Sequence, residues 1–304
     1  KLLIPLLSLS LLVTPAYSSH AAENTEAAGT SVESQGMLSP SSSSESSESV
    51  FNGSGAGTSS EPVTDEKLET ILKQVQSQLP AENGTWAVFI SDLVNGTEGS
   101  LNDQKMQAAS LIKLYIMGAV YENYDQITGQ YGRDSVDSNL YSMITVSDND
   151  AANTLTTYLG GGDSAAGMQA VNSFCQAHGY DQTHMGRMLL ASNENDDNYT
   201  SVGDCGHLLQ EIYKQDTSGY THAADMFNLL KAQTRCNKIP AQLPEGVKTA
   251  NKTGELDNVE NDAGIIYDSK NDIVIVFMSQ NLSSAGSAQN TIATLSRTIY
   301  DYYN

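Results

Sequence analysis

Three short motifs hold the side chains that could act together as a nucleophile, a base and an anion-binding group. In chain order they are Ser110-x-x-Lys113, Ser147-Asp148-Asn149 and Lys252-Thr253-Gly254. Ser110 is the only serine with a lysine three positions later, and residues three apart on a helix lie on the same face. A neutral or proton-relaying lysine there activates a serine hydroxyl, which is otherwise a weak nucleophile. The spacing therefore indicates an active-site serine.

Lys113 is expected to be buried, because its neighbours Leu111, Ile112 and Leu114 are apolar. A buried lysine is costly unless it is hydrogen-bonded or deprotonated, and a lowered pKa is what a general base or proton relay needs. Each residue also has an ordinary interpretation. Ser110 could cap a helix, and the stem of Lys113 could lie on apolar surface while its ammonium reaches water.

The other two motifs suit proton transfer and substrate binding, although each is ordinary when taken alone. Ser147-Asp148-Asn149 is also a common capping sequence at the start of a helix. The Lys252 ammonium and the Thr253 hydroxyl suit a substrate carboxylate, and Gly254 lets a ligand approach the backbone. Otherwise this last triplet is simply the end of a strand.

Together and in this order, the motifs resemble the signature of class A β-lactamases and penicillin-binding proteins. The resemblance covers essentially all of residues 63–304. It implies that Ser110 is the nucleophile, that Ser147 passes a proton to the leaving nitrogen, and that Asn149 binds the acyl-side amide of the substrate. It also implies an oxyanion hole formed by the backbone N–H groups of Ser110 and Glu255.

One departure from this family concerns deacylation. In class A β-lactamases a glutamate in the loop after the helical lobe activates the water that hydrolyses the acyl-enzyme. Alignment of the loop start puts Leu189 at that position, with Asn193 where an asparagine normally helps to hold the water. Glu194 is the nearest carboxylate, but its spacing is wrong. We therefore expect slow deacylation.

A second departure is the carboxylate of Glu255, directly after the third motif. It places a negative charge beside the pocket expected to hold a substrate carboxylate, and none of the chain's arginines lies on the predicted strand 263–267. At a few ångströms the repulsion is of order one to a few kcal/mol, so tight penicillin binding is not expected. On the loop, Arg187 is expected to pair with Asp196 or Asp197, or otherwise to be solvated.

The periodicity of the chain indicates a mixed α/β fold. Helices are predicted from Thr64 to Pro80 and at 110–120, 136–146, 150–159, 165–178, 203–213, 223–234 and 285–302, and strands at 86–90, after the Asn95-Gly96 turn, and at 247–253, 263–267 and 273–278. Strands from both chain ends imply one sheet, with the helical block as a second lobe and the cleft between them. The resemblance implies a β-lactamase/transpeptidase-like fold: a five-stranded antiparallel sheet flanked by helices, plus an all-helical lobe over about 110–236.

The first 62 residues differ in composition from the rest. Residues 1–22 begin with a lysine and an apolar run, which is typical of a secretory signal peptide; an uncleaved anchor is the alternative. Residues 23–62 are rich in Ser, Glu and Gly and have little to bury, so we expect a disordered linker, or a spacer through a cell wall. The domain is then 63–304, secreted and, after cleavage, not inserted in a membrane.

Charge and cysteine content restrict the partners. The net charge is −21, and residues 63–304 hold 14 basic and 30 acidic side chains, which excludes nucleic acid as a partner. The histidines lack metal-ligand spacing, so no metal or other cofactor is expected. Of Cys175, Cys205 and Cys236, the last two are the expected disulfide; three buried thiols are the alternative.

We therefore expect a monomeric hydrolase that is acylated at Ser110 by a small-molecule β-lactam or a related amide. Two other interpretations remain open. One is a D-alanyl-peptide carboxypeptidase or similar hydrolase acting on peptidoglycan-derived peptides. The other is a non-catalytic receptor that holds a β-lactam or a wall fragment.

Deletion of residues 23–62 should leave the melting temperature of the domain unchanged, because this segment has few apolar side chains to bury. Thermal unfolding of the full chain and of the deletion variant tests this. A drop of several degrees would mean that the segment packs on the domain.

Overall fold

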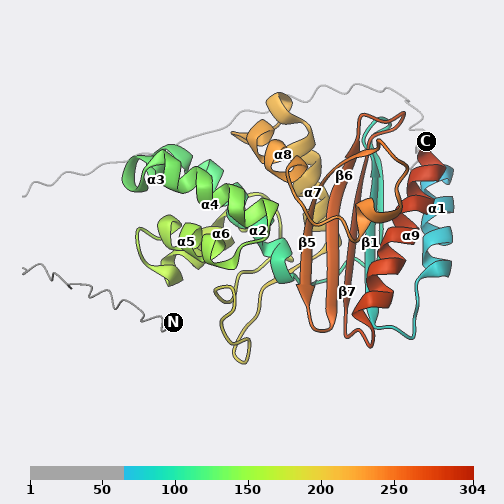
Figure 1. The fold of residues 1–304 in the computed structure, drawn as a ribbon, viewed down its shortest axis with the longest axis horizontal. Coiled ribbons are helices and arrows are strands. Elements are labelled where there is room, and N and C mark those ends of the chain that lie inside the picture. The colour runs from blue at the N-terminus through green and yellow to red at the C-terminus, as the bar shows by residue number, and fades with distance from the viewer. Residues whose placement is uncertain (1–64) are drawn as a thin grey trace, which may run out of the picture. The chain divides into compact units, whose positions relative to one another are not determined.

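The computed structural model of the chain describes residues 65–304. The predicted signal peptide (1–22) and linker (23–62) lie outside the described residues, as does Thr64. The described residues form a five-stranded antiparallel sheet with helices packed beside it, and a separate sheet of two short strands (Figure 1). The expected mixed α/β fold with a five-stranded antiparallel sheet is confirmed.

The elements follow the predicted periods closely. The helices are α1 (Glu66–Gln78), α2 (Ile112–Glu122), α3 (Tyr124–Tyr131), α4 (Arg133–Thr145), α5 (Asn149–Leu159), α6 (Ser164–Ala177), α7 (Val202–Tyr213), α8 (Ala223–Lys231) and α9 (Ala285–Tyr303). The strands are β1 (Thr85–Asp92), β2 (Thr97–Leu101), β3 (Met106–Gln107), β4 (Tyr199–Thr200), β5 (Lys248–Leu256), β6 (Val259–Tyr267) and β7 (Ile273–Gln280). The short helix α3 was not expected. The cap of α1 is Asp65, which accepts from the Lys67 and Leu68 N–H groups at 3.0 and 3.4 Å.

The sheet is built from both ends of the chain. Its strand order is β2-β1-β7-β6-β5, so β1 pairs with β7 along its whole length, with Val88 opposite Phe277. The strand that carries the third motif, β5, is therefore at the edge of the sheet. An edge strand keeps one row of backbone N–H and C=O groups free of sheet pairing, and such groups are available to a ligand.

The central strands are buried on both faces, which explains their nearly continuous apolar sequence. In β1, Ala87 and Phe89 face a core shared with α2 and α7, whereas Val88 and Ile90 face a second core shared with α1 and α9. Burial of each such large side chain contributes roughly 1.5–3 kcal/mol. These two cores hold the sheet, and hence β5, in a fixed position.

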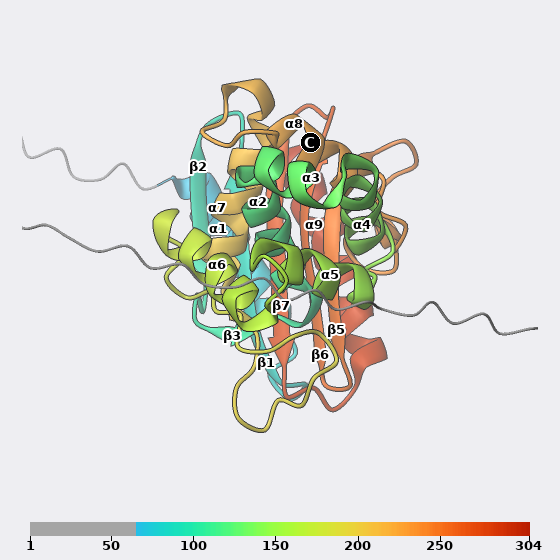
Figure 2. The ribbon, with the colours of Figure 1, turned by 90° about the vertical axis from the view of Figure 1, so that its left-hand side faces the viewer.

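Helix α2 is the centre of the helical part, since all of its residues from Ile112 to Tyr121 are buried. It packs against α4, α5 and α6. The last two helices of the predicted lobe lie instead against the sheet, α7 on β1 and β7 and α8 on β5 (Figures 1 and 2). None of the described helices is both long and apolar enough to span a bilayer.

The expected Cys205–Cys236 disulfide is wrong, because all three cysteines are free thiols. Cys205 is fully buried in α7, where its Sγ lies 3.4 Å from the hydroxyl of Tyr115. Cys236 is exposed on the loop after α8. Helix α7 thus turns Cys205 into the core, away from the surface where Cys236 lies.

Candidate active site

Ser110 lies in the short 3₁₀ turn Ala109–Leu111 that leads directly into α2. Ala109 has a φ of 47°, a conformation that non-glycine residues rarely adopt and that often marks a functional site. Ser110 is partly exposed, and its Oγ lies 3.2 Å from the Nζ of Lys113, which is completely buried. The helix thus places the hydroxyl and the amine together, as their spacing predicts.

The amine of Lys113 is oriented by two short hydrogen bonds. It donates to the Ser147 carbonyl and to Asn149 Oδ1, both at 2.7 Å. These bonds use two of its protons, so its remaining position is directed to the hydroxyls of Ser110 and Ser147, at 3.2 and 3.1 Å. Burial lowers the pKa of Lys113 to about 7. In the neutral amine that position is a lone pair, which can accept a hydroxyl proton.

Ser147 connects the second motif to the third. It has a φ of 62°, and its Oγ lies 3.1 Å from Lys113 Nζ and 2.9 Å from Lys252 Nζ. Lys252 is also completely buried, and burial, helped by the nearby positive charges of Lys113 and Arg235, holds its pKa well below the usual value. The Ser147 hydroxyl therefore bridges two lysines and can pass a proton between them.

The glycine of the third motif lets β5 approach the nucleophile. A Cβ on Gly254 would lie 2.9 Å from the Ala108 carbonyl oxygen and 3.2 Å from the Ser110 nitrogen. Any other residue would push the strand away from the Ser110 turn. This close approach at an edge strand places the backbone of the next residue, Glu255, beside Ser110.

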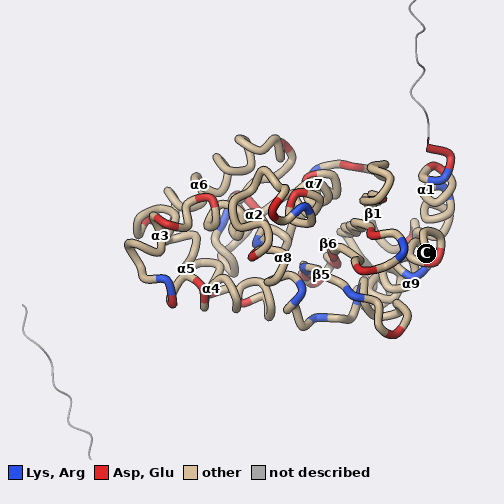
Figure 3. Tube along the Cα trace, turned by 90° about the horizontal axis from the view of Figure 1, so that it is seen from above, with Lys and Arg blue, Asp and Glu red and all other residues tan. Residues whose placement is uncertain are grey.

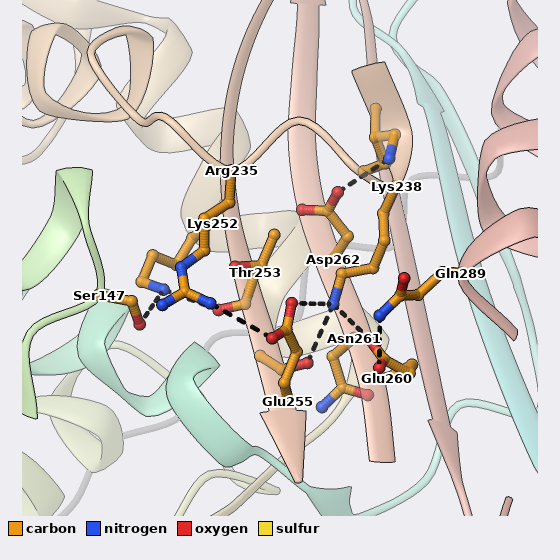
Figure 4. A network of polar contacts seen from close by, with 12 residues as sticks. Ser147, Arg235, Lys238, Lys252, Thr253, Glu255, Glu260, Asn261, Asp262 and Gln289 are labelled. Carbon is orange, nitrogen blue, oxygen red and sulfur yellow. Dashed lines mark hydrogen bonds and ion pairs between the residues drawn. The ribbon is translucent and has the colours of Figure 1, made fainter. Parts of the chain in front are cut away.

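Glu255 is not a free negative charge, which corrects the repulsion expected from the sequence. Its Oε2 lies 3.3 Å from Nη1 of Arg235, and its Oε1 lies 3.1 Å from Nζ of Lys238 (Figure 4). Burial alone would raise the pKa of Glu255, but these two cations outweigh it and the pKa is lowered. Sequence reasoning missed both partners, because they lie on the irregular segment between α8 and β5.

A cavity of about 530 Å³ opens over Ser110. Its walls include Ser110, Asn149, Leu189, Asn193 and Glu255. The structure thus brings residues of the first two motifs, the residue directly after the third motif and the predicted loop position around one cavity. Figure 3 shows basic residues interspersed with acidic ones along the described chain. Within residues 65–304, no group of three or more His, Cys, Asp or Glu side chains could hold a metal ion.

The loop that carries Leu189 is held from two sides. Asn153 in α5 donates to the Leu189 carbonyl at 3.0 Å and accepts from the Leu189 N–H at 2.8 Å. Of the two expected partners of Arg187, Asp197 is the one that binds it, at 2.6 Å. Leu189 is consequently buried in the cavity wall, while the next residue, Leu190, has a φ of 67° and is exposed.

Comparisons with known proteins agree with this arrangement. A sequence model described as "Beta-lactamase enzyme family" matches residues 67–134 and 130–303. The fold is similar to PBP-A, at 22% identity and a TM-score of 0.67 over 77% of this chain and 96% of that chain. It is similar to a leucine-to-glutamate mutant of PBP-A in an acyl-enzyme complex with penicillin G, at 23% identity and a TM-score of 0.66 over 77% and 96%. It is also similar to an ancestral class A β-lactamase, at 19% identity and a TM-score of 0.64 over 78% and 99%. Comparison with curated protein sequences gives no match.

The two lysines should respond differently to mutation and pH. Labelling of Ser110 by a fluorophosphonate should increase with pH through an apparent pKa of about 7, because only the neutral amine of Lys113 can accept the proton. Lys113→Ala should abolish labelling and Lys252→Ala should largely preserve it, since this reagent has no carboxylate to bind. Intact-mass measurement follows the labelling. An equal loss of labelling in both variants would contradict these separate roles.

Proposed function

The chain belongs to the β-lactamase enzyme family, and we propose that it is a secreted active-site-serine hydrolase that forms an acyl-enzyme at Ser110 with β-lactams or related amides. The observation that carries the proposal is the buried, oriented amine of Lys113, 3.2 Å from the Ser110 hydroxyl. A serine needs such a base to become a nucleophile.

In the proposed acylation, neutral Lys113 accepts the Ser110 proton while the Ser110 oxygen attacks the carbonyl carbon. The resulting oxyanion is bound by the N–H groups of Ser110 and Glu255, and each such donor is worth roughly 10²–10³ in rate. When the amide bond breaks, the Ser147 hydroxyl gives its proton to the leaving nitrogen. The Lys113 ammonium, 3.1 Å away, then returns a proton to Ser147.

The positive charges at the end of β5 are the proposed site for a substrate carboxylate. Lys252 and Thr253 are the sequence-predicted groups, and the Arg235 guanidinium adds a third donor. Arg235 also donates to the Val146 carbonyl at 3.4 Å, next to the Ser147 that Lys252 contacts. Asn149 uses its oxygen for Lys113, which leaves its amino group for the carbonyl of the substrate's acyl-side amide.

Deacylation should be slow, because the cavity wall has a leucine, Leu189, at the position where the attacking water needs a general base. Leu189 lines the cavity and is held there by Asn153. Glu194 is exposed and does not belong to the lining of the cavity. A positioned base contributes roughly 10²–10⁴ in rate. Lys113 could act on the water, but less well for a water that approaches from the loop.

The leucine at position 189 also favours a second candidate, a hydrolase or receptor for peptidoglycan-derived peptides that β-lactams only inhibit. The neighbour PBP-A is a protein for which a penicillin G acyl-enzyme has been trapped in a leucine-to-glutamate mutant. Turnover of a chromogenic cephalosporin separates this candidate from a working β-lactamase.

Ser110→Ala should remove all covalent labelling by penicillin without loss of the fold, because alanine is tolerated in the turn before a helix. Intact-mass measurement of the wild type and of the variant tests the nucleophile and the substrate class together. The wild type should carry one penicilloyl group for minutes or longer. Persistent labelling of the variant at another residue would contradict the assignment.

Leu189→Glu should increase penicillin turnover by roughly tenfold or more, because it supplies a general base for the attacking water. Such a base contributes up to about 10⁴ in rate. Asn195→Glu is the matched control, because it adds the same charge at an exposed residue of the same loop that does not belong to the lining of the cavity. Steady-state hydrolysis of both variants measures the effect. Fast multiple turnover by the wild type would show that another residue, Glu194 first, is the base.

A further inference from the structure

The carboxylate of Glu255 sits at the cavity rim between two cations of different character. Figure 4 shows Glu255 with Arg235 on its Ser147 side and Lys238 on the other. Lys238 is completely buried, whereas the side chain of Arg235 is 45% exposed and that of Glu255 is 32% exposed. Arg235, Glu255 and Lys238 therefore form a row that leads from the exposed surface to the interior of the protein.

Lys238 is a fixed anchor, since its ammonium has a full set of acceptors. Its Nζ lies 2.7 Å from Glu260 Oε2, 3.1 Å from Glu255 Oε1 and 3.3 Å from the Gly254 carbonyl. The other oxygen of Glu260 accepts from Gln289 of α9 at 2.9 Å. Lys238 would thus keep a permanent counterion in Glu260 even if Glu255 changed partners.

Arg235, by contrast, is held loosely. Its contacts to Glu255 and to the Val146 carbonyl are 3.3 and 3.4 Å long, and exposed ion pairs of this kind contribute little. Its guanidinium nevertheless lies beside the catalytic groups, because it reaches the Val146 carbonyl next to Ser147. Its positive charge adds to the effect of burial in lowering the pKa of Lys113 and of Lys252. A second carboxylate near Lys252 could therefore compete with Glu255 for this guanidinium.

We propose that Glu255 is an exchangeable internal counterion: it occupies Arg235 in the free protein, and an incoming substrate carboxylate takes Arg235 while Lys238 retains Glu255. This inference rests on the proposed function, because it concerns the carboxylate subsite of that active site. Its consequence is that Glu255 sets the preference of the enzyme between substrates with and without a carboxylate.

The test compares acylation of Ser110 by benzylpenicillin and by its methyl ester, which lacks the carboxylate. The ratio of the two second-order rate constants cancels any general effect on the oxyanion hole. Glu255→Gln should raise this ratio about fivefold, the range expected for one partly exposed ion pair. Glu245→Gln, which removes an exposed carboxylate that does not line the cavity, should leave it within about twofold. An unchanged ratio in Glu255→Gln, or an equal rise in both variants, overturns the proposal.

The anchor can be tested by removing Lys238 and Glu260 together as a neutral unit. In Lys238→Met/Glu260→Gln, Glu255 depends on Arg235 alone, so the same ratio should fall below that of the wild type. A rise would overturn the role of Lys238. Should this double variant fail to fold, Glu255→Gln still decides the proposal.

A second measurement does not require acylation. Phenylglyoxal should modify Arg235 faster in Glu255→Gln than in the wild type, and phenylacetate should protect Arg235 more strongly in that variant. Peptide mass mapping measures both. Equal rates and equal protection overturn the counterion proposal. If neither penicillin nor its ester acylates Ser110, the proposed function fails, and this measurement alone decides the role of Glu255.

Discussion

The active site depends on the complete burial of the Lys113 amine among neutral oxygens. Among the described residues, each hydrogen-bond partner of its Nζ is a hydroxyl, a carbonyl or an amide oxygen. An ammonium without a bonded carboxylate is poorly stabilised in such surroundings, so the neutral form is favoured. That one condition turns a structural lysine into a base. It requires the apolar helix α2, the strained Ser147 turn and the start of α5 to meet at a single atom.

Charge balance at the end of β5 follows from the same burial. Lys113 and Lys252 share the Ser147 hydroxyl, so a further uncompensated cation there would oppose the protonation of both. Arg235 and Lys238 are instead neutralised by Glu255 and Glu260. The region can thus attract an anion without a large excess of positive charge in the free protein. Glu255, an obstacle when only the sequence is considered, is part of this balance.

The sequence predicted the elements and the reacting groups because both depend on short-range patterns. Helical and strand periods located most elements, although α3 has too mixed a sequence to stand out. The two hydrogen bonds between Asn153 and the backbone of Leu189 were not predicted, although Asn153 lies one helical turn after Asn149. The partners of Glu255 could not be predicted, because Arg235 and Lys238 lie on an irregular loop 20 and 17 residues upstream. The predicted Cys205–Cys236 disulfide was wrong because the number of cysteines does not indicate which face of α7 carries Cys205.

The strand order has a consequence for the time at which this protein becomes chemically competent. Ser110 and Lys113 are made early, but Lys252 and the backbone beside it reach them only on β5, which is held through β6 and β7 against β1. Pairing Thr85 with Gln280 closes a loop of nearly two hundred residues, a contact that forms slowly and late in folding. During synthesis, the nascent chain would therefore carry its nucleophile without the groups that make it reactive. Competence would arrive only after β7 has emerged and paired with β1.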